Sequence, residues 1–180
     1  MSRRFNMLFL TRHLPVAGRL QPGVFERYDE PLFPTLALRE ALVNALCHRD
    51  YSAPGGSISL AIYDDRLEIT NEGRLPEGLR VEDLKLDHPS RPRNPLIARA
   101  FYLRKLVEEW GRGTLQIVEL CTKAGHPEPE FEEVGGSMLV RFLPGTTLAV
   151  AGVPLNLLQR QIVRLSQIVQ PGLLAETDAE

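Results

Sequence analysis

The chain has 180 residues, of which 43% are hydrophobic and 24% charged, and its formal net charge at pH 7 is −2. This is the composition of one globular domain with short appendages. The pI of 6.1 excludes the strongly basic surface of a typical nucleic-acid-binding domain, so we expect DNA contact only through a separate domain, if at all. Nothing in the sequence reaches the length of a membrane span. We expect the two cysteines to be buried free thiols and the protein to be soluble and cytoplasmic.

The first 34 residues predict a short helix and an irregular connection. Phe5, Leu8 and Phe9 are at helical spacing, which predicts an amphipathic helix over 2–13. Proline and glycine recur between 14 and 34 and indicate an extended or turning connection, with one edge strand over 24–28.

A helix beginning after Thr35, the expected N-cap, carries two polar residues on a mostly apolar surface. Glu40 and Asn44 are four residues apart and therefore share one face. The pair either sits at a solvated edge or faces a bound metal and phosphate. Geometry alone favours the solvated edge, so the decision depends on the rest of the chain.

Two segments with alternating apolar and polar residues, 57–63 and 66–70, predict a β-hairpin with one buried face. The hairpin should stop in the polar and glycine-rich stretch that contains Asn71 and Gly73. One helical turn is expected over 81–86.

The second half predicts two helices. Asn94 as N-cap and Pro95 at the first helical position should start a helix that runs towards Trp110. Residues 111–114 should open the next helix, which ends near Gly125.

Two further elements are expected towards the C-terminus. Residues 131–134 and 138–142 predict a second hairpin, and 157–169 predict a last helix before an acidic tail. Helices and hairpins are segregated along the chain, which predicts an α+β fold: a two-layer sandwich with a mixed, mostly antiparallel sheet and helices on one face. We divide the chain into an N-terminal helix and connection (1–34), a central domain (35–143) and a linker with a short helix and tail (144–180).

The polar residues recur in an order that resembles a known group of proteins. An acid and an amide on a helix, a polar residue and a glycine ending a buried strand, and a glycine pair opening a later helix resemble the GHKL ATPases. This Bergerat-fold group includes gyrase, heat-shock chaperone, mismatch-repair and histidine-kinase domains. Segments 38–52, 93–98, 109–113 and 125–131 look most like the RecG-like C-terminal ATPase-type domain of prokaryotic regulators, usually found behind a Schlafen/Alba-type DNA-binding domain.

The resemblance implies a role for each position of the first two segments. Glu40 matches the general base that activates the attacking water, and Asn44 matches the amide that ligates Mg²⁺. Asn71 matches the position where an aspartate commonly accepts the adenine amino group; its amide oxygen can accept the same bond without charge assistance. Gly73 would let the backbone approach the adenine. Leu75 replaces a glycine of the wider group, so weaker nucleotide binding is implied.

The third segment is implied to hold the phosphates. Gly111 and Gly113 would expose backbone N–H groups at a helix N-terminus, and Arg112 would contact phosphate directly. Candidates for the lid region are Arg91, Arg93 and Arg99.

The function implied by this resemblance is Mg²⁺-dependent ATP binding with slow or regulatory hydrolysis, in a transcriptional regulator or a piece of one. The cofactors would be ATP and Mg²⁺, and a homodimer stays open. The alternative is a degenerate, non-catalytic scaffold that serves as a dimerisation or interaction module. The chain contains no Gly-x-x-x-x-Gly-Lys-Ser/Thr segment, so it is not a P-loop helicase motor.

Overall fold

The computed structural model describes residues 14, 16–20, 27–54, 56–63, 65–106, 112–145 and 161–164. Only the backbone is described for 16–20, 27–30 and 161–164. The expected helix over 2–13 lies outside these residues, as do Gly111 and the acidic tail.

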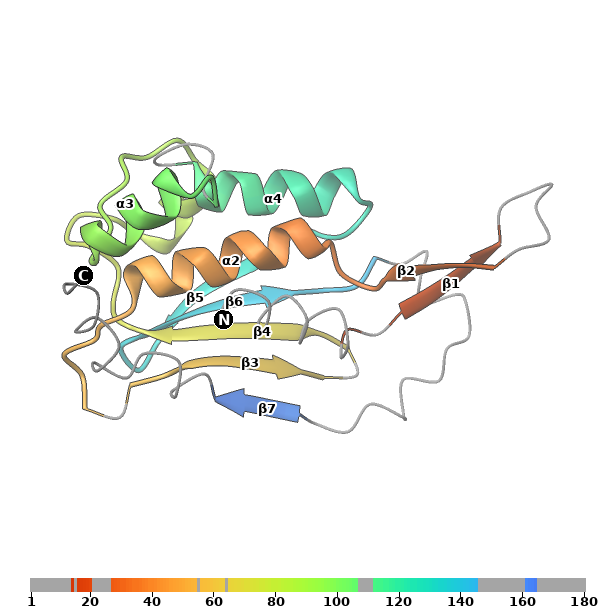
Figure 1. The fold of residues 1–180 in the computed structure, drawn as a ribbon, viewed down its shortest axis with the longest axis horizontal. Coiled ribbons are helices and arrows are strands. Elements are labelled where there is room, and N and C mark those ends of the chain that lie inside the picture. Colours follow the sequence, from red (N-terminus) through yellow and green to blue (C-terminus); the bar gives the residue numbers. More distant parts are fainter. Residues whose placement is uncertain are drawn as a thin grey trace, which may run out of the picture.

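The described part of the chain forms a sheet with helices on one face (Figure 1). The strands are β3 (Ile58–Ile62), β4 (Leu67–Glu72), β5 (Glu130–Val134), β6 (Ser137–Phe142) and β7 (Gln161–Arg164), in the order β5-β6-β4-β3-β7. The covering helices are α2 (Thr35–His48), α3 (Pro95–Leu103) and α4 (Gly113–Lys123), and a 3₁₀ turn, η1, spans Val81–Lys85. The predicted α+β two-layer fold is confirmed. All pairings among the described strands are antiparallel, so the mixed sheet that we expected is not seen there.

Helix α2 is the centre of the hydrophobic core. Ala37, Leu38 and Ala41 are at most 1% exposed, and they belong to one cluster with Ile69 of β4 and Ile117 of α4. Small alanine side chains allow a helix to approach its neighbours closely, and burial of the larger apolar groups supplies the main stabilising free energy. The core therefore fixes α2 between the sheet and α4.

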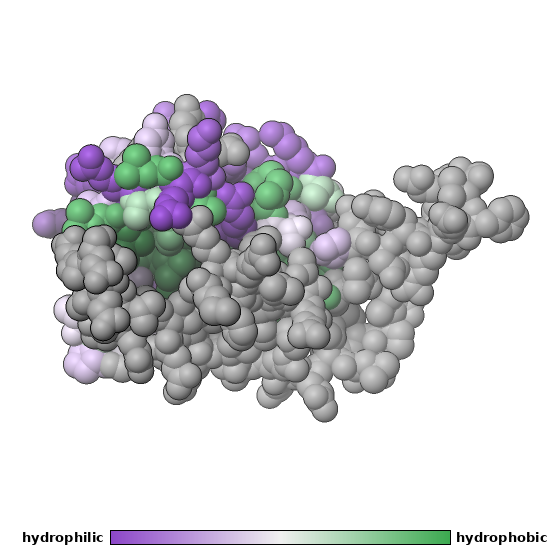
Figure 2. Space-filling view, viewed as in Figure 1, coloured by the Kyte–Doolittle hydropathy of each residue, from purple (hydrophilic) through white to green (hydrophobic). Residues whose placement is uncertain are grey.

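A smaller apolar cluster joins α2 to α3. Val43, Cys47 and Ala98 are buried in it, and Ile97 and Phe101 pack against them. In Figure 2, hydrophobic residues (green) show between hydrophilic ones (purple) over the helix layer. Helix α3 is thus held to α2 by a narrow contact rather than by the main core.

The first hairpin forms as the alternation predicts. In β3 and β4 every second residue is buried, and Leu60 pairs with Ile69 in the antiparallel register. Strand β4 continues to Glu72, two residues beyond the predicted end, because Asn71 and Glu72 still pair with β6.

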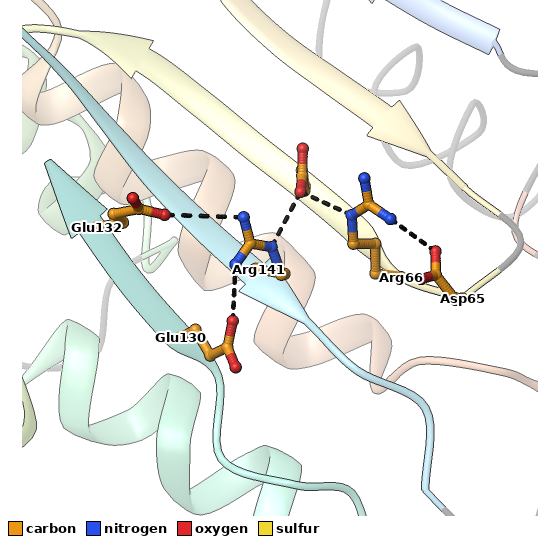
Figure 3. A network of polar contacts seen from close by, with 6 residues as sticks. Asp65, Arg66, Glu130, Glu132 and Arg141 are labelled. Carbon is orange, nitrogen blue, oxygen red and sulfur yellow. Dashed lines mark hydrogen bonds and ion pairs between the residues drawn. The ribbon is translucent and has the colours of Figure 1, made fainter. Parts of the chain in front are cut away.

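The sheet face opposite the helices carries a charge network across three strands (Figure 3). The Nε atoms of Arg66 and Arg141 donate to the same carboxylate oxygen of Glu68, at 2.8 Å and 2.9 Å. Arg141 also pairs with Glu130 at 2.8 Å and with Glu132 at 3.7 Å. Burial raises the pKa of Glu68, but the hydrogen bonds from Arg66 and Arg141 outweigh it and hold that pKa below its ordinary value.

Arg141→Met is expected to lower the free energy of unfolding at pH 7 by about 1–3 kcal/mol, because Glu68, only 14% exposed, loses a charge-assisted partner. A depressed folded-state pKa adds stability above the ordinary glutamate pKa, and this stability is lost as the pH falls through the folded-state value. Urea unfolding from pH 7 to pH 3 measures both effects. The matched control is Arg80→Met, because the Arg80 side chain is 76% exposed and its pair with Asp83 should contribute little. Equal losses in the two variants would contradict a specific role for the network.

The segment before α2 differs from the prediction. Two strands pair antiparallel there, β1 (Val16–Leu20) and β2 (Arg27–Pro31). Of the expected edge strand over 24–28, residues 27 and 28 belong to β2, and 24–26 lie outside the described residues. The predicted N-cap is wrong by one residue: Thr35 is the first residue of α2, and Pro34 is the N-cap. Extended backbone at Pro34, with φ −61° and ψ 111°, starts the helix without a side-chain cap, and its carbonyl accepts from the Leu38 N–H.

Helix α3 begins at Pro95 as predicted but ends at Leu103, well before Trp110. Lys105 adopts a left-handed conformation, with φ 53°. The Lys105 N–H donates to the carbonyl of Tyr102 and the Leu106 N–H to that of Phe101. These two bonds form a Schellman motif, which stops the helix although the left-handed residue is a lysine and not a glycine.

The predicted helix over 157–169 is wrong at 161–164, which form β7. This segment pairs antiparallel with β3, with Leu60 opposite Val163. Without it the outer edge of β3 would leave N–H and C=O groups without partners, and pairing satisfies them. The rest of 157–169 lies outside the described residues.

The remaining predictions for this half are confirmed. Helix α4 ends before Gly125, whose φ is +78°, and β5 and β6 form the second hairpin around Gly135 and Gly136. The two glycines have φ +59° and +86°, a turn that L-residues adopt at a cost.

Candidate functional site

A pocket with a cavity volume of about 120 Å³ lies between the helix layer and the sheet. Its walls come from α2, the end of β4, the loop over 73–92, the start of α4 and strands β5 and β6. This space is large enough for several water molecules and is lined by both polar and apolar groups. It therefore has the mixed character expected of a ligand site.

Glu40 and Asn44 line this pocket from one face of α2, as their spacing predicts. Glu40 is 7% exposed, which is rare for a carboxylate. The start of α4 lies against the pair: a Cβ placed on Gly113 would be 2.6 Å from Asn44 Nδ2 and 2.8 Å from Glu40 Oε1. Only glycine leaves room for both side chains, so Gly113 brings the N-terminal end of α4 onto the acid–amide pair.

Two polar atoms beside this contact are buried without a hydrogen-bond partner among the described residues. They are Asn44 Nδ2 and the Thr114 hydroxyl. Buried polar groups are normally satisfied, so such atoms at a pocket wall indicate a place for a ligand or water. Thr114 was not among the site residues predicted from the sequence. Its position directly after Gly113, in the first turn of α4, is the signal that could have found it.

Asn71 and Gly73 lie at the end of β4 and line the same pocket. Asn71 is 6% exposed, and its Nδ2 donates to the Glu72 carbonyl over a long 3.4 Å. Gly73 has φ +125°, and a Cβ there would be 2.9 Å from the His48 carbonyl oxygen. Gly73 thus allows the strand end to pass directly against the C-terminal end of α2.

The pocket also has an apolar wall, in addition to the polar groups at the start of α4 and at the end of β4. It is formed by side chains of Ile69, Leu84, Phe131, Met138 and Val140. An apolar wall beside a few polar groups is typical of a small-molecule site.

Basic residues stand at the rim. Arg74, His88 and Arg91 line the pocket, and Arg93 beside them pairs with Asp50 at 3.3 Å and donates to the Arg74 carbonyl. Arg99, another lid candidate, does not line the pocket. The rim is therefore suited to an anionic ligand.

Two ionisable groups inside the pocket are held in their neutral forms. Burial lowers the pKa of His48, and the charges of Arg93 and His88 lower it further. Burial, with a smaller contribution from Glu40, raises the pKa of Cys47 to about 12. A thiol with that pKa is not a nucleophile at neutral pH, which agrees with its place in the apolar cluster.

The structure thus brings together five of the seven residues selected from the sequence. Glu40, Asn44, Asn71, Gly73 and Gly113 line one pocket. Arg112 does not line it; its side chain is 57% exposed, and its guanidinium lies 3.7 Å from the Glu119 carboxylate. Gly111 lies outside the described residues.

One protein family is similar to the middle of this chain. Residues 55–142 match the family described as "Putative ATP-dependent DNA helicase recG C-terminal". The match supports an ATPase-like domain of the histidine-kinase type. It includes Asn71, Gly73 and Gly113 but begins after α2, so Glu40 and Asn44 are outside the matched residues.

Among solved structures, the crystal structure of the DIP2311 protein from Corynebacterium diphtheriae is similar to this chain, with a TM-score of 0.66 and 24% sequence identity. The similarity covers 78% of this chain and 28% of that one, and it shows a shared fold. The chain therefore spans less than a third of the length of that protein. No curated protein matches the chain. Among the described residues, none of the helices combines the length and apolar character that crossing a membrane requires.

Proposed function

We propose that this chain binds Mg·ATP in the pocket between α2, β4 and α4, and that it hydrolyses the nucleotide slowly or uses it as a regulatory signal. One observation carries the proposal. The acid–amide pair of α2 meets the glycine at the start of α4 in the same pocket that Asn71 and Gly73 line.

The base and the phosphates would occupy opposite ends of this pocket. The purine would lie against the apolar wall, with its six-membered ring edge at Asn71. The phosphates would face the first N–H groups of α4, where the helix dipole favours negative charge. The cations Arg74 and Arg91 at the rim would attract the triphosphate, and Arg112 could reach it only by leaving its contact with Glu119.

The residues present fit a magnesium ion that is shared with the nucleotide. The described residues contain no group of three or more His, Cys, Asp or Glu side chains able to hold a metal. Mg²⁺ commonly takes only one or two protein ligands and completes its shell with phosphate oxygens and water. Among the described residues Asn44 Nδ2 is buried without a hydrogen-bond partner. The oxygen of the same amide would be the metal ligand. The ion would neutralise phosphate charge.

Glu40 is proposed as the general base for hydrolysis. Its carboxylate is buried beside Asn44 and Gly113, so it would lie next to the phosphates. A positioned base of this kind typically contributes about a hundred- to ten-thousandfold to a rate.

Calorimetric titration with ATP, with and without Mg²⁺, tests this function. We expect saturable binding at one site per chain, weakened about tenfold or more by removal of Mg²⁺, because an Asn44–Mg²⁺–phosphate link is then lost. Adenosine serves as the control for the phosphate end and should bind more weakly than Mg·ATP. Absence of binding to ATP under both conditions would favour the alternative, a non-catalytic scaffold for dimerisation or interaction.

The wider role is proposed on the same basis. The chain would be the cytoplasmic nucleotide-responding part of a transcriptional regulator, as a monomer or homodimer. With a net charge of −2, it would leave DNA binding to a separate domain.

A further inference from the structure

We propose that the pocket accepts a 6-oxopurine nucleotide, ITP, within about tenfold of its affinity for ATP. The inference rests on the proposed function, because it assumes that a purine edge meets Asn71. It concerns which purine the site selects and follows from how the Asn71 amide is held.

The backbone of Asn71 is fixed, but its amide is not. The residue pairs with Ile58 of β3 and Met138 of β6 and is 6% exposed. Among the described residues its side chain makes one hydrogen bond, from Nδ2 to the Glu72 carbonyl at 3.4 Å, which is beyond the usual range for N–H···O bonds.

The amide of Asn94, in contrast, is held in one orientation by two short hydrogen bonds. Its Nδ2 donates to the Cys47 carbonyl at 3.0 Å and to the Arg49 carbonyl at 2.7 Å. Two short bonds to carbonyls determine which end of that amide is nitrogen. Among the described residues Asn71 makes no such pair of bonds, and one long contact with the Glu72 carbonyl is all that favours one orientation of its amide over the other.

The two orientations match two different purine edges. A primary amide offers an acceptor oxygen and a donor nitrogen side by side. In one orientation the oxygen accepts from the 6-amino group of adenine while the nitrogen donates to N1. After a half-turn about the last side-chain bond, the nitrogen donates to a 6-oxo group while the oxygen accepts from N1–H.

Among the described lining residues, no carboxylate other than Glu40 would repel the oxo form at this position. Glu40 is the one carboxylate among the described lining residues, and it contacts Gly113 of α4. A carboxylate reads an amino group and repels an oxo group, whereas an amide can serve both. A site with fixed hydrogen bonds rejects the wrong partner by about 10⁴–10⁵. After the half-turn the Asn71 oxygen would take the place of Nδ2 opposite the Glu72 carbonyl oxygen, at about the same long separation. The loss of the long hydrogen bond and the oxygen–oxygen contact together correspond to about tenfold.

Titration of the full chain with ATP, ITP and GTP in the presence of Mg²⁺ tests the inference. We expect ITP within about tenfold of ATP. GTP separates the effect of the 2-amino group from that of the 6-oxo group. A larger gap between ATP and ITP would overturn the inference while leaving ATP binding, and thus the proposed function, in place. Failure of all three nucleotides to bind would overturn both.

Two variants identify the residue that reads the base. Asn71→Asp replaces the amide with a group that only accepts, so at pH 8 the ATP-to-ITP affinity ratio should rise about tenfold or more relative to wild type. Asn71→Leu, of similar size, removes both functions and should weaken ATP and ITP equally. An unchanged ratio in Asn71→Asp would show that another group reads the base and would also overturn the inference.

Discussion

Phosphate release from saturating Mg·ATP is expected to slow about a hundred- to ten-thousandfold when Glu40 is replaced by Gln, while ATP affinity stays nearly unchanged. Gln keeps the size and hydrogen bonding of a side chain that is 7% exposed, so the core should tolerate it. It removes only the basicity that would activate water. Because that water is not part of the nucleotide, ground-state binding should depend little on it.

Asn44→Ala, by contrast, should weaken the binding of Mg·ATP itself, because it removes the proposed metal ligand. Glu72→Gln is the matched control: it makes the same chemical change on β4, at a residue that does not line the pocket. Binding isotherms beside phosphate-release rates distinguish the three variants. If wild type and Glu40→Gln release phosphate at the same background rate, hydrolysis is not a function of this domain and Glu40 acts in a sensor or scaffold.

Those parts of the fold whose signals are local were predictable from the sequence. The alternation in 57–63 and 66–70 placed β3 and β4, because each strand buries one face against the helices. Asn94 and Pro95 placed the start of α3, and Gly125 placed the end of α4. Each of these signals depends on residues within one turn or one strand.

The wrong predictions concern elements that depend on partners distant in the sequence or on an unusual local backbone conformation. Residues 161–164 become a strand because β3, about a hundred residues earlier, has an edge to pair. The end of α3 uses Lys105 in a conformation that usually indicates glycine, so the sequence gives no stop there. Extended backbone at Pro34 starts α2 without a side-chain cap. The prediction looked for a capping side chain and therefore placed the N-cap at Thr35, one residue too late.

The same distinction between local and distant signals holds for the candidate site. Spacing of four along a helix was enough to place Glu40 and Asn44 on one face. Spacing could not show that α4 would lie on this face, since the contact joins residues about seventy positions apart. Nor could it show that Arg112, beside Gly113, would lie outside the pocket. Adjacent side chains at a helix start point in different directions, so a basic residue between two glycines is no evidence of phosphate contact.

Gly113→Ala is expected to weaken Mg·ATP binding about tenfold or more without unfolding the protein. The new Cβ would lie 2.6 Å from Asn44 Nδ2, 2.8 Å from Glu40 Oε1 and 2.9 Å from Asn44 Oδ1, so both side chains must move. Each of these atoms is at the end of a side chain, which lets the fold adjust, and alanine is the better helix former, so the melting temperature should change little. The methyl group would displace Asn44 and Glu40, the pair proposed to hold the metal and activate water.

Gly56→Ala is the matched control, because its Cβ would meet the Glu72 carboxylate at the same 2.6 Å but Gly56 does not line the pocket. Titration and thermal unfolding of both variants measure the difference: only Gly113→Ala should lose affinity. Normal Mg·ATP binding by a folded Gly113→Ala protein would separate the α2–α4 contact from the nucleotide site and leave that contact a purely structural role.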